Sequence, residues 1–214
     1  QSARDVLDQA VGYFKDNQDV DMTQCWVGAC YADEATHVDK FIEEALQQPN
    51  VKSTAALHRA GVEIWLKRSD IAKAERHLSI LMKTGTVTVK DIHDIVAAWY
   101  KSRDPRAALN ATKWLERCEM PILMPTVPMF KMCIKLWMRR DTLPAVRQAH
   151  NLVKLAESCN LKLANTTYRN VLQGLVAHGQ LGLAIDILRQ VNGDQELYSN
   201  VLVAYCQTGT LEGA

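Results

Sequence analysis

The sequence predicts an all-α protein, more specifically a right-handed α-solenoid of stacked helix-turn-helix repeats. Apolar residues recur at intervals of three and four along most of the chain, and strand-like alternation is nearly absent. Large residues, mostly aromatic, also return at near-regular intervals, as in repeat proteins. A pair of short helices cannot bury its apolar faces alone, so we expect successive pairs to stack on one another.

The first predicted helix lies near the start of the chain, over residues 4–14. It places five apolar residues on one face: Val6, Leu7, Ala10, Val11 and Phe14. We assign residues 1–20 to the second helix of a preceding repeat, with Ala10 as its small residue. Residues 71–82 carry a similar apolar stripe and are also expected to be helical.

Residues 21–214 then contain about five and a half repeats in one continuous domain. The anchor residues of the first helices are spaced 34, 34, 38, 38 and 30 residues apart: Gln24, His58, Ile92, Phe130, Tyr168 and Tyr198. Seven residues after the anchors lie Tyr31, Trp65, Trp99, Trp137, Leu175 and Tyr205, which we expect to fill the core rather than to stack on bases. Turns are predicted four residues later, at Ala35, Ser69, Arg103, Asp141, Gly179 and Gly209. Five residues beyond each turn comes a mostly small residue, which lets paired helices approach: Lys40, Ala74, Ala108, Val146, Ala184 and Ala214.

Three second helices carry start signals. Asp104 is an expected N-cap, followed by Pro105, whose missing N–H costs nothing in a first turn. Asp70 and Thr142 are expected to cap in the same way, each ahead of an alanine-rich or leucine-rich stretch.

Charge and cysteine usage narrow the function classes. Lysine plus arginine (25) nearly balances aspartate plus glutamate (24), so any nucleic-acid site must come from local charge placement. No apolar run approaches a membrane span, and we expect no membrane insertion. The cysteines form no CxxC pair and are expected to be reduced, with Cys25 and Cys30 as core thiols. Because the sequence begins at Gln1 and ends in an apparent first helical turn, we expect it to be cut from a longer protein.

Neither catalysis nor metal binding is predicted. The sequence has no P-loop, GxGxxG, nucleophile elbow or HExxH motif, so we expect no enzyme activity and no cofactor. His58 occupies an anchor position and is expected to be packed. The other histidines considered have no Cys, Asp or second His at metal-ligand spacing: His37, His77, His150 and His178.

Residues 165–191, and residues 197–214 over half a motif, resemble the pentatricopeptide repeat. The matching residues are Tyr168, Val171, Leu172, Gly174, Gly179, Leu181, Ala184, Ile187 and Val191. The upstream units share mainly the turn, the small residue and the aromatic residue. The tetratricopeptide repeat is the alternative, and the variable spacing together with Val-Leu followed by Gly favours the pentatricopeptide kind.

The resemblance implies an organellar protein, mitochondrial or alternatively of the chloroplast, that binds single-stranded RNA along the first helices. Such proteins act in RNA processing, stability, editing or translation. The alternative is a structural scaffold subunit of a large organellar ribonucleoprotein, such as a mitochondrial ribosome, which works through protein contacts. The partners would then be ribosomal RNA and protein subunits of that assembly. A tetratricopeptide-like adaptor for peptide tails is a third reading.

In this family the residue after each anchor helps to read a base. Here these residues are Cys25, Arg59, His93, Lys131, Arg169 and Ser199, of which only Ser199 is a conventional reader. We therefore expect phosphate contacts from a column of Arg59, His93, Lys131 and Arg169 instead of a base code. The cations near the ends of first helices form a second set, for which an ordinary solvated surface is the alternative: Lys67, Arg68, Lys101, Arg139 and Arg140. An acidic partner protein would also fit these two sets of cations.

Overall fold

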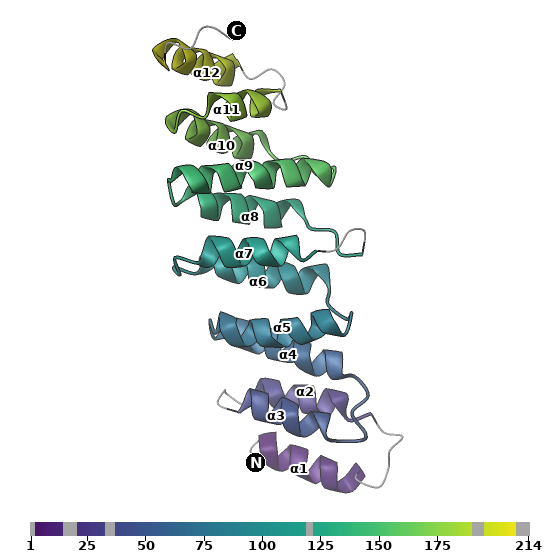
Figure 1. Cartoon of the computed structure of the whole chain (residues 1–214). Helices are drawn as coiled ribbons and strands as arrows, with labels where there is room; N and C mark the ends of the chain where they lie inside the picture. The colour runs from purple at the N-terminus through teal and green to yellow at the C-terminus, as the bar shows by residue number, and fades with distance from the viewer. Residues whose placement is uncertain (1–2, 15–20, 33–36, 119–121, 190–194, 209–214) are drawn as a thin grey trace. The chain divides into compact units, whose positions relative to one another are not determined.

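The computed structural model describes residues 3–14, 21–32, 37–118, 122–189 and 195–208, and all regular structure in these ranges is helical. The expectation of an all-α protein is confirmed. Twelve helices are described, and Figure 1 shows them in chain order. They are α1 (Ala3–Phe14), α2 (Thr23–Ala32), α3 (Val38–Leu46), α4 (Thr54–Lys67), α5 (Ile71–Lys83), α6 (Val89–Lys101), α7 (Ala107–Glu116), α8 (Val127–Met138), α9 (Leu143–Ser158), α10 (Asn165–Ala177), α11 (Leu181–Leu188) and α12 (Gln195–Thr208).

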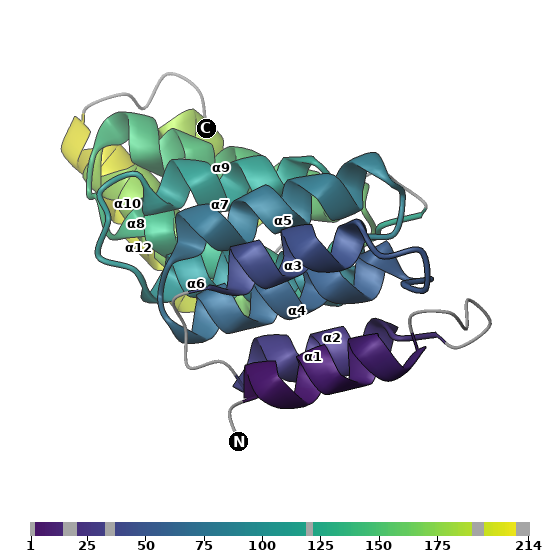
Figure 2. The same ribbon diagram turned by 90° about the horizontal axis from the view of Figure 1, so that it is seen from below.

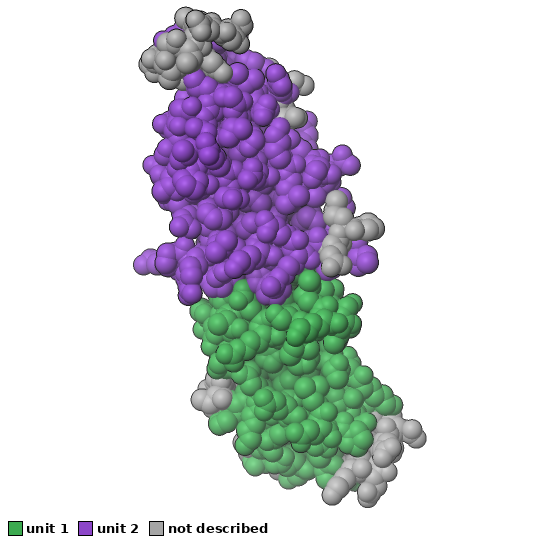
Figure 3. Space-filling model, in the orientation of Figure 1, with its two compact units in different colours: residues 1–98 green, residues 99–214 purple. Residues whose placement is uncertain are grey.

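The chain divides into two compact units, residues 1–98 and residues 99–214 (Figure 3). In the first unit, α4 packs most extensively against α5, and α2 contacts α1, α3 and α4. In the second unit, α8 packs against α7, α9 and α10, and α10 also contacts α9, α11 and α12. Figure 2 shows α1 and α2 of the first unit side by side. These contacts join helices one or two places apart in chain order, as a helical repeat requires.

The six anchor positions all lie in even-numbered helices, from Gln24 in α2 to Tyr198 in α12. The small residues Ala74, Ala108, Val146 and Ala184 lie in odd-numbered helices, and all four are buried. Lys40 of α3 is exposed instead, and its ammonium lies 3.9 Å from Glu44 of the same helix. Ala214 lies outside the described residues.

The aromatic residues that follow the anchors are mostly core residues. Trp65 and Trp99 are buried, and half-buried Trp137 donates its indole N–H to Thr112 Oγ1 at 2.9 Å. Tyr31 does not fit the expected core position: its side chain is exposed, and its hydroxyl donates to Glu63 Oε2 at 2.6 Å. The side chain of Tyr205 is outside the described part.

Most of the predicted turns separate the two helices of a pair. Ser69, Asp141 and Gly179 have φ angles of 63°, 43° and 68°, so the left-handed conformation recurs at equivalent places. Arg103 lies in the connection between α6 and α7. The expected turns at Ala35 and Gly209 fall outside the described residues.

The expected caps have three different outcomes. Asp70 caps α5, because its carboxylate accepts from the Lys73 backbone N–H at 3.1 Å. Asp104 is not the N-cap of α7: its carboxylate accepts from the Arg106 N–H at 2.7 Å, and α7 begins two residues later than expected, at Ala107. Thr142 is the N-cap residue of α9, but its side chain makes no capping hydrogen bond. Its extended backbone and the proline in the first turn mark the start of that helix.

The cysteines are free thiols, but they do not all lie in the core. Cys30, Cys133 and Cys159 are buried, whereas Cys25 is exposed, so the expectation of a core thiol at Cys25 is wrong. Burial raises the pKa of the Cys133 thiol to about 12. None of the helices in the described ranges is long and apolar enough to cross a membrane.

Candidate nucleic-acid interface

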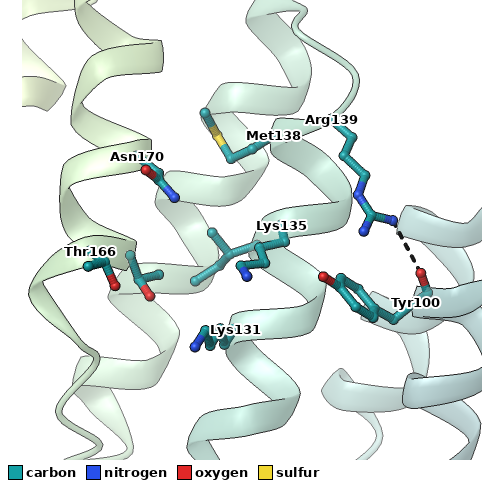
Figure 4. Close-up of a pocket in the computed structure, with 9 residues that line it drawn as sticks. Tyr100, Lys131, Lys135, Met138, Arg139, Thr166 and Asn170 are labelled. Carbon is teal, nitrogen blue, oxygen red and sulfur yellow. Dashed lines mark hydrogen bonds between the residues drawn. The ribbon is translucent and has the colours of Figure 1, made fainter.

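A basic groove lies between α8 and α10 in the second unit, with Tyr100 at the end of α6 completing its wall (Figure 4). Its volume is about 480 Å³, within the range of ligand sites. The lining residues are Tyr100, Lys131, Ile134, Lys135, Met138, Arg139, Thr166, Thr167 and Asn170. None of these lining residues is acidic.

The basic wall of the groove follows from helical geometry. Lys131, Lys135 and Arg139 are spaced by four residues, so successive turns of α8 and its C-cap carry them on one face. Each four-residue step advances about 6 Å along the helix axis. The opposite face of α8 carries Phe130, Cys133 and other buried residues, which anchor the helix in the core. The same packing that holds α8 therefore directs its cations outward.

Two of these cations are available to a ligand. Lys131 and Lys135 are exposed, and neither has an ion pair or a side-chain hydrogen bond with any residue in the described ranges. Arg139 is held in place: it donates to the Tyr100 carbonyl at 3.2 Å, and its guanidinium lies 4.5 Å from the centre of the Tyr100 ring. With no carboxylate in the lining, the groove has a positive potential and suits an anion.

The facing wall is neutral and polar. Thr166 and Asn170 are one turn apart on α10, both are exposed, and Figure 4 shows them on the side of the groove opposite the lysines. Their hydroxyl and amide groups can donate and accept hydrogen bonds. The groove thus combines positive charge on one side with uncharged polar groups on the other.

Gly174 of α10 lies close to both α8 and α9. A Cβ atom at this position would lie 2.5 Å from the terminal methyl of Met138 and 3.3 Å from Val146 Cγ2. The Met138 methyl ends a flexible side chain and can shift, so the contact with Val146 of α9 is the tighter constraint. Gly174, which matches the pentatricopeptide pattern, therefore lies at a close packing contact of α10.

The other residues predicted for the phosphate column do not line this groove. Arg59, in the first unit, donates to both carboxylate oxygens of Asp91 at 3.2 and 3.3 Å and to the Thr86 carbonyl at 2.8 Å. Asp91 is buried, so this ion pair neutralises Arg59 and leaves it little capacity for a phosphate. His93 Nδ1 lies 3.5 Å from Asp94 Oδ1, and Arg169 is half-buried.

The remaining predicted contacts have separate surroundings. Lys67 is exposed, and its ammonium lies 5.4 Å from the centre of the Tyr31 ring. Lys101 is exposed at the end of α6. Ser199, the one conventional base reader, donates its hydroxyl to the Gln195 carbonyl at 3.0 Å. Of the residues proposed from the sequence, Lys131 and Arg139 both line this groove.

Sequence reasoning missed several groove residues. Lys135 carried a usable signal, because it lies four residues from both Lys131 and Arg139. Thr166, Asn170 and Tyr100 carried none, since their relation to α8 depends on tertiary packing. Tyr100 is the clearest case, as it lies 31 residues before Lys131 in the chain.

The first unit contains a series of hydrogen-bonded polar side chains, from buried His58 to half-buried Asp39, that sequence spacing did not reveal. His58 Nδ1 lies 3.1 Å from His77 Nδ1, and His77 Nε2 lies 3.1 Å from Asp39 Oδ1. Trp65 donates its indole N–H to the same Asp39 oxygen at 2.7 Å. The expectation that His58 is packed is confirmed, since both histidines are buried. The described residues contain no cluster of three or more His, Cys, Asp or Glu side chains able to hold a metal ion.

No protein-family model matches the sequence, and no curated protein matches it.

Proposed function

We propose that this chain is an RNA-binding α-solenoid of the pentatricopeptide kind, which holds single-stranded RNA through its backbone phosphates. The observation that carries the proposal is the pair of unpaired ammonium groups of Lys131 and Lys135 in the α8–α10 groove. A protein with almost balanced charges keeps these two lysines without acidic partners in the described ranges. Unpaired cations at regular spacing suit a polyanion with regularly spaced charges.

In this proposal the two walls have different tasks. Lys131, Lys135 and Arg139 contact successive phosphates of an extended strand, which positions the strand without specifying its sequence. Thr166 and Asn170, on the facing helix, contact ribose hydroxyls or base edges. Binding therefore depends mainly on the negative charge of the strand and only weakly on its base sequence. On the ground of the family resemblance, we propose that this activity serves RNA processing, stability or translation in a mitochondrion, or alternatively in a plastid.

A double substitution, Lys131→Gln with Lys135→Gln, tests the proposal. The probe is a labelled oligouridylate of about a dozen nucleotides, and the readout is fluorescence anisotropy in about 0.1 M salt. We expect affinity to fall about 20-fold, because each lost phosphate contact removes about 0.7 from the logarithmic salt slope.

The matched control is Lys113→Gln with Lys162→Gln. Both of these lysines are exposed in the second unit, and neither lines the groove. The control removes the same charge and should change affinity by less than about twofold. Equal losses in the two double variants would refute a local phosphate site and leave only nonspecific charge attraction.

A second function, the scaffold subunit of an organellar ribonucleoprotein, is favoured by a different surface. In α12, Tyr198, Leu202 and Val203 are exposed, with 41%, 61% and 54% of their surfaces accessible. Apolar groups gathered on one helix are typical of protein contacts. Binding to a purified subunit of such an assembly that persists at high salt, with no affinity for oligouridylate, would favour this function over the first.

A further inference from the structure

A second basic hollow lies beside the groove, where the α6–α7 connection meets the end of α8. Its volume is about 280 Å³. The lining residues are Ser102, Arg103, Asp104, Pro105, Ala107, Ala108, Leu136, Arg139 and Arg140. We call it the turn hollow, and all of it belongs to the second unit.

Arg139 lines both the groove and the turn hollow. Its Nη1 atom donates to the Tyr100 carbonyl, and the Tyr100 ring lies beneath the guanidinium. A guanidinium carries five N–H donors, so this one bond leaves others for a ligand. Figure 4 shows this contact between Arg139 and Tyr100. The contact holds the cation where it lines both hollows.

The turn hollow has an excess of positive charge. Arg103 and Arg140 are exposed, and neither forms an ion pair with a residue in the described ranges. The Arg140 guanidinium lies 5.4 Å from the centre of the Trp137 ring, which limits its motion. The single carboxylate in the lining, Asp104, already accepts from the backbone N–H and the guanidinium of Arg106. These bonds hold the pKa of Asp104 below its usual value, so it stays charged and paired.

We propose that the turn hollow is a second phosphate subsite and that the strand bound in the groove continues into it across Arg139. This inference rests on the proposed function and adds the route that the bound RNA strand follows. The strand would follow α8 from Lys131 to Arg139, then pass over the helix end between Arg140 and Arg103. The ligand is a phosphodiester chain of at least several nucleotides rather than a mononucleotide.

Oligonucleotide length separates the two subsites. A 5′-phosphorylated trinucleotide of uridine has enough phosphates for the groove alone, whereas an oligouridylate of about a dozen nucleotides reaches both hollows. The variant Arg103→Gln with Arg140→Gln should weaken binding of the long probe about 20-fold in about 0.1 M salt. The same variant should change the affinity for the trinucleotide by less than about twofold.

The outcomes distinguish failure of the path from failure of the proposed function. If the arginine variant binds the long probe as tightly as the wild type, while Lys131→Gln with Lys135→Gln weakens both probes, the strand does not enter the turn hollow. If neither variant weakens either probe, the groove itself is not an RNA site. Circular dichroism of each variant shows whether it remains folded, and all four substituted side chains are exposed.

Discussion

At the residue scale, burial has its clearest effect on the protonation of His58. Its pKa lies below the ordinary value of 6.5, first because the imidazole is buried and second because of the neighbouring His77. His77 lies between Asp39 and His58, with its Nδ1 atom 3.1 Å from His58 Nδ1. Because burial disfavours the charged form of an imidazole, the folded chain favours a neutral His58.

The free energy of unfolding should decrease as the pH falls through 6.5. The unfolded chain takes up a proton on His58 at its ordinary pKa, whereas the folded chain takes it up only at a lower pH. Urea titrations between about pH 7.5 and pH 5 measure this slope. The variant His58→Gln should show a shallower slope than the wild type. The slope of His150→Gln makes the same comparison for the second unit, because burial also lowers the pKa of His150. Equal slopes for the wild type and His58→Gln would contradict a lowered pKa of His58 in the folded protein.

The same residues show where sequence reasoning stops. A packed His58 could be predicted because its anchor position lies on the apolar face of a helix. Its bond to His77 could not, because the relevant spacing is set by how α4 crosses α5. Arg59 shows the same limit, since its partner Asp91 lies 32 residues away. A sequence pattern gives the position of a cation on its own helix but not whether another helix supplies an acid.

At the scale of elements, the close packing of α4 against α5 depends on the glycine at position 61. A Cβ atom at Gly61 would lie 2.9 Å from His77 Cδ2. The backbone of α4 is thus close enough to contact the His77 ring directly. The Nε2 atom of that ring is held 3.1 Å from Asp39 Oδ1, and its Nδ1 atom lies 3.1 Å from His58 Nδ1, so the ring has little freedom to move away.

Gly61→Ala should therefore lower the free energy of unfolding by about 1–3 kcal/mol, the usual cost of overpacking a core. Gly28→Ala is the matched control, because Gly28 is also inside a helix of the first unit and has no heavy atom within 4 Å of its added Cβ. The control should be stabilised by about 0.5–1 kcal/mol through helix propensity. Both values come from urea unfolding curves, and equal effects of the two substitutions would show that the crossing tolerates a side chain.

The elements were more predictable than their contacts. Anchor, aromatic and turn spacing gave the alternation of first and second helices, because each helix must bury one stripe and end at a residue that tolerates a turn. Ser69 and Asp141 adopt positive φ at turns that the spacing predicted. Tyr31 broke the pattern, since Glu63 of α4 holds its hydroxyl at the surface. Repetition predicts position in a helix, whereas burial depends on the neighbouring helix.

At the scale of the whole molecule, the net charge is close to zero, but the charged residues are unevenly distributed. In the first unit, Arg59 is paired with Asp91, and Lys90 lies within 4 Å of both Glu63 and Asp94. In the second unit, the groove and the turn hollow gather cations with one paired carboxylate between them. The sequence predicted that any nucleic-acid site must come from local charge placement. The site proposed here lies in the second unit, and the structure was needed to show which cations have an acidic partner, as Arg59 does, and which have none in the described ranges.

The salt dependence of RNA affinity tests the central claim most directly, namely that the α8 cations contact phosphates. For an oligouridylate of about a dozen nucleotides, the logarithm of affinity is measured against the logarithm of salt concentration for the wild type and for Lys131→Gln with Lys135→Gln. Removing two phosphate contacts should make the slope shallower by about 1.4, while the control variant Lys113→Gln with Lys162→Gln keeps the wild-type slope. A slope that is the same in all three proteins would contradict the claim, whatever their absolute affinities.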